Sequence, residues 1–218
     1  MTDELDLRAA PGFVEPALRA EFPALRLDWV TVAGRSRESP PEVRLRLAEL
    51  SNKYRGANVV AMRAQPIPHA YRAFYHQVGL DPDADRIPLE QVALGRLLHG
   101  GFRSGGVIED ALLISLVETG VPVWALDARM VDAGGLGIRM TVPGDRLGAG
   151  ELASHLAPGR LAVADASNVH ALLFGGIAPG HGVSERTERI ALFAVGVQGV
   201  PAIHIEEALW VCAEVLRA

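Results

Sequence analysis

Apolar residues recur every three or four positions through much of the first half of the chain, which is the spacing of an amphipathic α-helix. The clearest case is residues 40–55, where two prolines open a segment whose apolar residues share one side of a helix. Residues 108–120 are apolar nearly all round and therefore predict a buried helix. The predicted helices cover residues 40–55, 69–80, 88–101, 108–120 and 202–216.

Short apolar runs bounded by Gly, Pro, Asn and Asp dominate the second half, and such runs are typical of β-strands. The predicted strands cover residues 25–34, 121–127, 137–142, 161–166, 169–175 and 190–197. Because helices gather in the first half and strands in the second, the pattern favours an α+β fold over a repeating βαβ fold. No linker divides the chain, so we expect a loosely held lead-in over residues 1–24 and a single domain over residues 25–218.

The composition narrows the class of protein. Of the 218 residues 49% are hydrophobic, so the chain can bury a core without disulfides, and its one cysteine, Cys212, lies on the apolar side of the last predicted helix. No apolar run reaches the length of a membrane span, and residues 1–12 lack the pattern of a signal peptide. We therefore expect a cytoplasmic protein with no membrane partner.

Charge and histidine spacing exclude several kinds of site. The formal net charge of −5 argues against broad, non-specific nucleic-acid binding but allows a local arginine patch. Lys53 is the only lysine of the chain, so no other segment can supply the lysine that a P-loop requires. The seven histidines are scattered without metal-ligand spacing, and residues 81–86 (DPDADR) depart from a calcium loop at the sixth position. We expect neither a metal ion nor a cofactor.

The glycine-rich stretch LLFGGIAPGHGVSERTERIAL (172–192) matches neither GxGxxG nor the GxSxG nucleophile motif. Its glycines free backbone N–H groups and allow a ligand to approach closely. We expect residues 175–186 to form the rim of the main pocket, with His181 and Arg186 facing it, Arg189 close by and Ser184 capping the turn that follows. A purely structural loop is the alternative.

Two longer segments, taken in order, resemble the B-three/B-four region of the bacterial phenylalanyl-tRNA synthetase β subunit. They are DALLISLVETGVPVWALDARMVDAGGLGIRM (110–140) and LAVADASNVHALLFGGIAPGHGVSERTERIAL (161–192), and the likeness extends over roughly residues 69–200. The positions that match the family's pattern are Asp110, Glu118, Gly120, Pro122, Asp127, Arg139, Asp165, Gly182, Val183 and Thr187.

The resemblance implies an α+β, three-layer arrangement with a sandwich-like mixed β core and flanking helices. It also implies a link to tRNA, because in the synthetase this region hydrolyses tyrosine wrongly attached to the tRNA for phenylalanine. By the same resemblance, the Asn, His and Glu of the family's pocket fall on Leu113, Trp124 and Phe193, which are apolar. Apolar side chains cannot orient a water molecule for hydrolysis.

We therefore expect a free-standing, tRNA-associated domain that binds RNA or aminoacyl-tRNA, and not a complete tRNA ligase. The family's own editing chemistry is not expected, and hydrolysis of aminoacyl-tRNA by other residues stays open as an enzymatic alternative. Two alternatives stay open: a small-molecule-binding protein or enzyme that reuses the pocket, with Trp124 as an aromatic wall and Arg103, His181 or Arg186 as polar contacts, and a non-catalytic partner-binding module. Asp127 also fits a turn or cap, and Arg103 a surface arginine. The candidate pocket residues are Arg103, Asp110, Leu113, Trp124, Asp127, His181, Ser184, Arg186 and Phe193.

Overall fold

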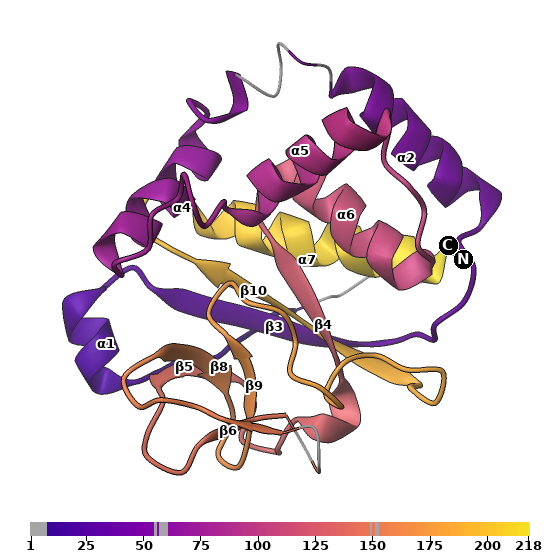
Figure 1. Cartoon of the computed structure of the whole chain (residues 1–218). Coiled ribbons are helices and arrows are strands. Elements are labelled where there is room, and N and C mark those ends of the chain that lie inside the picture. Colours follow the sequence, from indigo (N-terminus) through magenta and orange to yellow (C-terminus); the bar gives the residue numbers. More distant parts are fainter. Residues whose placement is uncertain (1–7, 55, 57–60, 149, 151–152) are drawn as a thin grey trace.

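Two β-sheets lie one above the other beneath a layer of helices (Figure 1). This computed structural model describes residues 8–54, 56, 61–148, 150 and 153–218. Residues 1–7 of the predicted lead-in and position 55 of the first predicted helix lie outside the described residues. The α+β class predicted from the sequence is confirmed, and the three layers are helices, a four-stranded sheet and a six-stranded sheet.

The four-stranded sheet lies in the middle of the molecule. Its order is β1-β3-β10-β4, and its neighbouring strands are antiparallel. The strands are β1 (Ala10–Pro11), β3 (Arg26–Ala33), β10 (Arg189–Gly196) and β4 (Val123–Asp127). All of β10 after Arg189 is buried, because helices cover one face of the sheet and the second sheet covers the other.

The six-stranded sheet is mixed, with the order β2-β5-β8-β9-β6-β7. Strand β2 runs parallel to β5, and β6 runs parallel to β9, whereas the other neighbours are antiparallel. The strands are β2 (Phe13–Val14), β5 (Gly137–Met140), β8 (Leu161–Ala164), β9 (Val169–Leu172), β6 (Arg146–Leu147) and β7 (Ser154–His155). Strand β9 ends at Leu172, short of the predicted Gly175, because the chain turns at Phe174, where φ is 60°.

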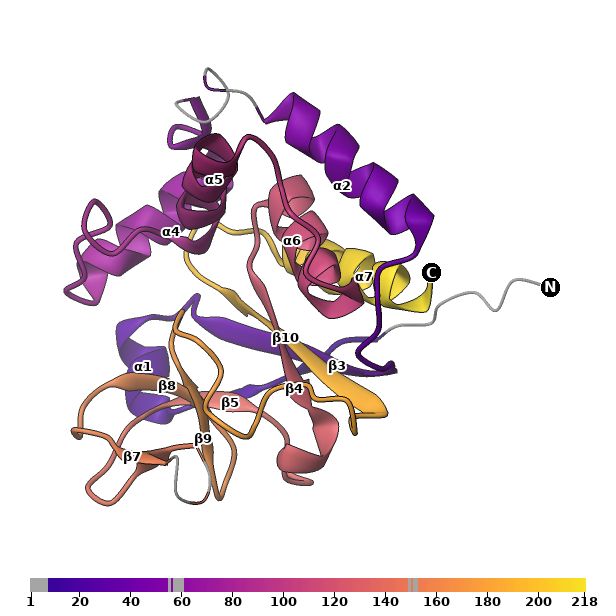
Figure 2. The same ribbon diagram turned by 45° about the vertical axis from the view of Figure 1, so that its right-hand side comes forward.

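Helices cover the other face of the four-stranded sheet, as Figure 2 shows from the side. Helix α7 contacts β3, β10 and β4 and packs against α6, where the Ser115 hydroxyl donates to the Ala208 carbonyl oxygen at 2.8 Å. Proline occupies the first turn of several helices, where its missing N–H costs nothing. The helices are α1 (Pro16–Glu21), α2 (Pro41–Lys53), α4 (Pro66–Gln77), α5 (Pro88–His99), α6 (Val107–Thr119) and α7 (Ala202–Arg217), with a 3₁₀ turn, η1, at Ala128–Met130.

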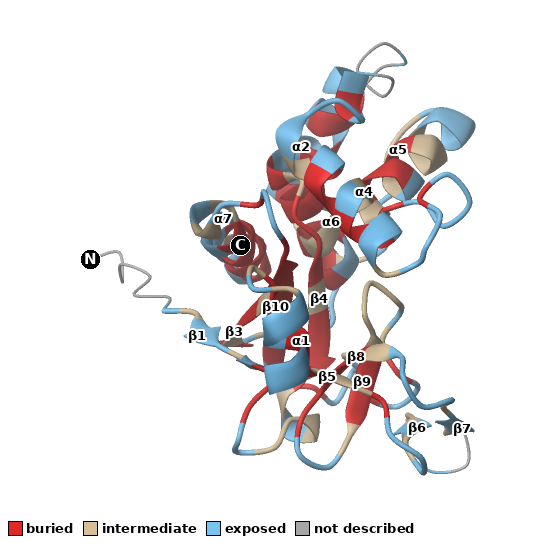
Figure 3. Ribbon diagram, turned by 90° about the vertical axis from the view of Figure 1, so that its left-hand side faces the viewer, coloured by how far each residue is buried: buried red, intermediate tan, exposed pale blue. Residues whose placement is uncertain are grey.

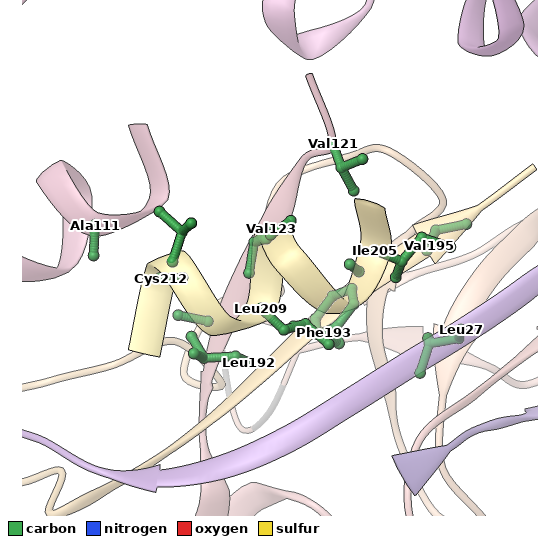
Figure 4. Packing of buried hydrophobic residues seen from close by; sticks show 14 of the residues in the cluster. Leu27, Ala111, Val121, Val123, Leu192, Phe193, Val195, Ile205, Leu209 and Cys212 are labelled. Atoms are coloured by element: carbon green, nitrogen blue, oxygen red, sulfur yellow. The ribbon is translucent and has the colours of Figure 1, made fainter. Parts of the chain in front are cut away.

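The core lies between α7 and the middle sheet. Leu192 of β10 lies beneath Leu209 and Cys212 of α7, and Ile205 of the same helix lies farther along β10, near Val195 (Figure 4). The thiol of Cys212 is fully buried, and this burial raises its pKa, so it remains an uncharged packing group. The buried residues run continuously through the strands of the middle sheet and the inner faces of α6 and α7 (Figure 3).

The segment before residue 25 takes part in both sheets, contrary to the expectation of a loosely held lead-in. Strand β1 pairs with β3, and β2 pairs with β5. Gly12, between them, lies so close to the chain that an added Cβ atom would stand 2.4 Å from the Leu136 carbonyl oxygen. Two-residue strands are too short for a sequence pattern to reveal, so this pairing depends on the partner strands.

Candidate functional site

A pocket of about 370 Å³ opens beside the middle sheet, and we call it the arginine pocket. Its floor includes Trp29 and Thr31, which lie two positions apart on β3 and therefore share one face of the strand. The side walls come from the segment that follows β4 and from the turn that precedes β10. The lining residues are Trp29, Thr31, Ala128, Arg129, Val131, Asp132, Arg186, Glu188 and Arg189.

Strand register explains why these segments meet. Ile190 pairs with Asp127 on one side and with Val32 on the other, so the exit of β4, the entrance of β10 and the end of β3 lie together. A turn with φ of +77° at Gly135 lies against the ring of Trp29, and a Cβ atom there would be 2.9 Å from its Cζ2 atom. Only glycine fits this close approach without strain.

The arginine pocket carries more positive than negative charge. Three guanidinium groups and two carboxylates line it. One of the carboxylates, Glu188, pairs with Arg35 at 2.9 Å. Among the residues that the structure describes, Arg186 and Arg189 have no ion-pair partner, and both are exposed. These two guanidinium groups are thus open to an anionic ligand.

Asp127 joins the two walls of the pocket. Its buried carboxylate accepts from the guanidinium group of Arg129 at 2.6 Å and from the Thr187 hydroxyl at 2.7 Å, and it caps η1 by accepting from the Arg129 backbone N–H at 3.0 Å. These hydrogen bonds, first of all the one from the Arg129 guanidinium, lower the pKa of Asp127 to about 2. Asp127 therefore stays ionised and positions Arg129 at the pocket.

Ser184 and Arg186 lie in the turn that leads into β10. The Ser184 backbone N–H donates to the Thr187 hydroxyl at 3.0 Å, and the Thr187 N–H donates to the Ser184 carbonyl oxygen at 3.0 Å. The Ser184 hydroxyl accepts from the Arg186 N–H at 3.4 Å, a long contact. Arg186 lines the arginine pocket, and Ser184 shapes the turn that carries it.

His181 does not line the arginine pocket, although the sequence analysis expects it to face the main pocket. Its side chain is buried, with 1% of the residue exposed. The loop folds back beneath β4, because the Asp127 N–H donates to the His181 carbonyl oxygen at 3.0 Å. The ring then lies against His170, with the two Nδ1 atoms 3.0 Å apart.

Trp124 and Phe193, two positions that the resemblance places in the family's pocket, are packed into an aromatic cluster. The indole N–H of Trp124 donates to the Gly175 carbonyl oxygen at 3.1 Å. Phe174 packs its ring against Trp124, Tyr71 and Tyr75, with centroids 5.2 to 6.0 Å apart. Aromatic rings thus occupy the space beside Trp124.

Leu113, Asp110 and Arg103 lie on or before α6 and do not line the arginine pocket. Leu113 is half-buried against the core. Asp110 is fully buried and accepts from the hydroxyl groups of Ser39 and Ser104 at 2.6 and 2.5 Å, which fixes the loop before the helix. Arg103 is exposed in that loop.

Sequence reasoning missed most of the pocket. Trp29 reads as one more apolar position of a strand, and Arg129 as a residue of a turn. The pairing of β3, β10 and β4 brings these two residues together. The apolar pattern of one strand does not show which other strands it pairs with. Of the residues that line the pocket, the sequence analysis placed only Arg186 and Arg189 close to a pocket.

Comparison with known proteins leaves the family open. The chain matches no family model, and a search of the curated proteins finds no matching sequence. In the described part of the chain, no helix combines the length and apolarity needed to cross a membrane. Within the same residues, no group of three or more His, Cys, Asp or Glu side chains is placed to hold a metal ion.

Proposed function

We propose that this protein binds the single-stranded end of an RNA, such as the 3′ end of a tRNA or aminoacyl-tRNA, in the arginine pocket. The observation that carries the proposal is the position of Trp29 among Arg129, Arg186 and Arg189. Single-stranded nucleic acid is bound by aromatic side chains that stack on bases and by cationic side chains that contact the phosphates. This pocket offers both within about 370 Å³, a volume in the range of ligand sites.

The charge distribution supports a local contact with the end of an RNA over a broad electrostatic one. The whole chain has a formal net charge of −5, so the protein as a whole does not attract phosphate. The two unpaired arginines lie in the turn before β10 and at its first residue, where the end of an RNA strand can reach them while the rest of the RNA lies away from the protein. The resemblance to the synthetase region supports tRNA as the source of that end.

The proposed role is binding without the synthetase's editing chemistry. Hydrolysis of an aminoacyl ester requires polar groups that hold a water molecule close to the carbonyl carbon. At the positions that the resemblance assigns to those groups, Trp124 and Phe193 stack on each other, and Leu113 packs against the core. The small-molecule alternative has less support, since Trp124 already packs against Phe174 and Phe193.

The test is fluorescence anisotropy with a 5′-labelled single-stranded oligoribonucleotide that ends in CCA. We expect binding that weakens as salt rises, and the double variant Arg186→Ala/Arg189→Ala to reduce the slope of log K against log salt by about 1.4, two phosphates at about 0.7 each. Trp29→Ala is expected to cost about 1–3 kcal/mol through lost stacking.

Arg103→Ala is the matched control, because Arg103 is also exposed but lies outside the pocket. It should bind as the unmodified protein does. No binding at low salt, or equal binding by the double variant and the unmodified protein, would reject the proposal. Circular dichroism of each variant establishes that the fold is retained.

A further inference from the structure

A buried chain of three side chains lies behind the arginine pocket. The Nε2 atom of His170 is 2.8 Å from Oδ2 of Asp165, and its Nδ1 atom is 3.0 Å from Nδ1 of His181. Each of the three residues is at most 1% exposed. Neither the proposed binding site nor the resemblance assigns a role to the histidine pair.

The hydrogen bonds to Asp165 fix its charge. Burial by itself would raise the pKa of this carboxyl group, but four donors outweigh it and lower the pKa to about 2. The donors are the backbone N–H groups of Asp132, Ser167 and Asn168 and the ring of His170. An ionised carboxylate only accepts, so His170 carries a proton on Nε2.

This assignment determines the remaining protons of the neutral chain. With its proton on Nε2, His170 presents a lone pair at Nδ1, and His181 must donate to it from its own Nδ1. His181 is then left with a lone pair on Nε2. That atom is buried and has no hydrogen-bond partner among the described residues.

The chain is joined to the wall of the arginine pocket at two points. The Asp132 N–H donates to Asp165 Oδ2 at 3.0 Å, and the Asp127 N–H donates to the His181 carbonyl oxygen at 3.0 Å. These two residues bound the segment 127–132, which contributes Ala128, Arg129, Val131 and Asp132 to the pocket. The wall is therefore held from behind by Asp165 and His181.

We propose that Asp165, His170 and His181 position this wall, and that a proton added at Nε2 of His181 releases it, so that the pocket loses RNA on mild acidification. The proposal rests on the proposed RNA-binding function. The neutral pair carries one proton on each ring. A further proton on Nε2 of His181 would give that ring a positive charge and an N–H group with no acceptor among the described residues, and a buried, unpaired charge is costly. The charged ring of His181 must therefore move to reach water. This movement also takes the His181 carbonyl oxygen away from the Asp127 N–H group, which breaks their hydrogen bond.

The charged groups around His181 come from several elements. Burial first, and His170 second, lower the pKa of His181, whereas Asp165 acts in the opposite direction. On the side of β4, Asp127 is neutralised by Arg129, and Arg139 of β5 interacts with Asp165. Asp132 contributes its backbone N–H to the chain. Within the described part of the chain, no carboxylate forms a hydrogen bond with Nε2 of His181 that would offset a charge there.

The binding test compares affinity for the CCA-ending oligoribonucleotide near pH 7.5 and near pH 5.5. General electrostatics predicts tighter binding at the lower pH, because acidification makes any protein more positive. The proposal predicts the reverse, a loss of affinity of about tenfold for each pH unit below the pKa of His181. His181→Asn keeps a donor toward His170 without the titrating Nε2, so its affinity should not fall between pH 7.5 and pH 5.5.

The second measurement needs no RNA. Nitrogen NMR of the imidazole rings should show opposite neutral tautomers, with the proton on Nε2 of His170 and on Nδ1 of His181. The protection factor of the Asp127 amide, which compares its hydrogen exchange with the intrinsic rate at the same pH, should fall on acidification. His204→Asn is the control, since the side chain of His204 is 41% exposed and lies on α7, away from the pocket lining.

The outcomes separate the two proposals. If the tautomers and the exchange behave as expected but the oligoribonucleotide does not bind, the positioning chain stands and the RNA-binding function fails. If the oligoribonucleotide binds more tightly near pH 5.5, or if His181→Asn retains an acid-induced loss of affinity, the release mechanism is overturned. The same tautomer on both rings would overturn it as well.

Discussion

The rings of Trp124 and Phe193 are stacked, with centroids 5.4 Å apart and planes within 10° of parallel. The two residues are direct cross-strand neighbours on β4 and β10, so the contact is set by the register of the pairing. Phe193 is 1% exposed and Trp124 is half-buried. This stack closes the place where the resemblance expects polar groups.

We expect no deacylation of tyrosyl-tRNA for phenylalanine above the rate without protein. A missing general base alone typically costs about 100- to 10,000-fold in rate, and here the surrounding side chains are apolar as well. The measurement is loss of the tyrosyl ester over time in a filter-binding assay. Rapid hydrolysis by the unmodified protein, unchanged in Trp124→His/Phe193→Glu, would mean that the chemistry lies elsewhere in the chain.

Phe193→Ala is expected to lower the free energy of unfolding by about 3–5 kcal/mol, because it removes a buried ring from the centre of β10 and leaves a cavity. Urea unfolding followed by tryptophan fluorescence measures the effect. Ile203→Ala is the control. Its side chain is 64% exposed on α7, so the change there should stay within about 0.5 kcal/mol. Similar losses in both variants would contradict this account of the core.

Tyr71→Phe tests a single buried hydrogen bond. The Tyr71 hydroxyl donates to the Val195 carbonyl oxygen at 2.8 Å, which ties α4 to β10. Its removal leaves a buried acceptor without a partner and should cost about 1–3 kcal/mol. Tyr75 lies on the same helix, and its hydroxyl forms no hydrogen bond within the described residues, so Tyr75→Phe should be nearly neutral. The prediction fails if the two variants unfold at the same urea concentration.

Stability should fall in two stages as the pH is lowered. The folded state lowers the pKa of His181 below 6.5, so the unfolded chain binds the proton more readily, and stability is complete above pH 6.5 and declines below it. The pKa values of Asp127 and Asp165 are lowered from 3.8 to about 2, so a second decline occurs as the pH falls from 3.8 toward 2.

Unfolding in urea at a series of pH values measures both stages. His181→Asn should lack the first decline and keep the second, whereas Asp127→Asn should weaken only the second. A stability curve of the unmodified protein that is flat between pH 7 and pH 5 would contradict the burial of a neutral His181.

The sequence by itself determined the longer elements and the class of the fold. The helix over residues 108–120 and the strand over residues 190–197 follow from apolar spacing and length, and both lie within one residue of their predicted starts. Such patterns are local, since each reports the environment of residues a few positions apart. The turn at residues 184–187 is local in the same way, and the sequence predicted that Ser184 and Arg186 belong to it.

Only the tertiary structure showed which side chains these elements bring into contact. Asp127 accepts a hydrogen bond from Thr187 across 60 positions of the chain, and Trp29 and Arg189 line the same pocket because β3 pairs with β10. His181 is the clearest case: flanked by glycines, it looked like a residue exposed at a pocket rim, yet it is buried against His170. Glycines in a sequence indicate that a loop can turn tightly, but they do not indicate in which direction it turns. That direction is set by distant partners, here the Asp127 N–H and the ring of His170, whose hydrogen bonds offset the cost of burying an imidazole.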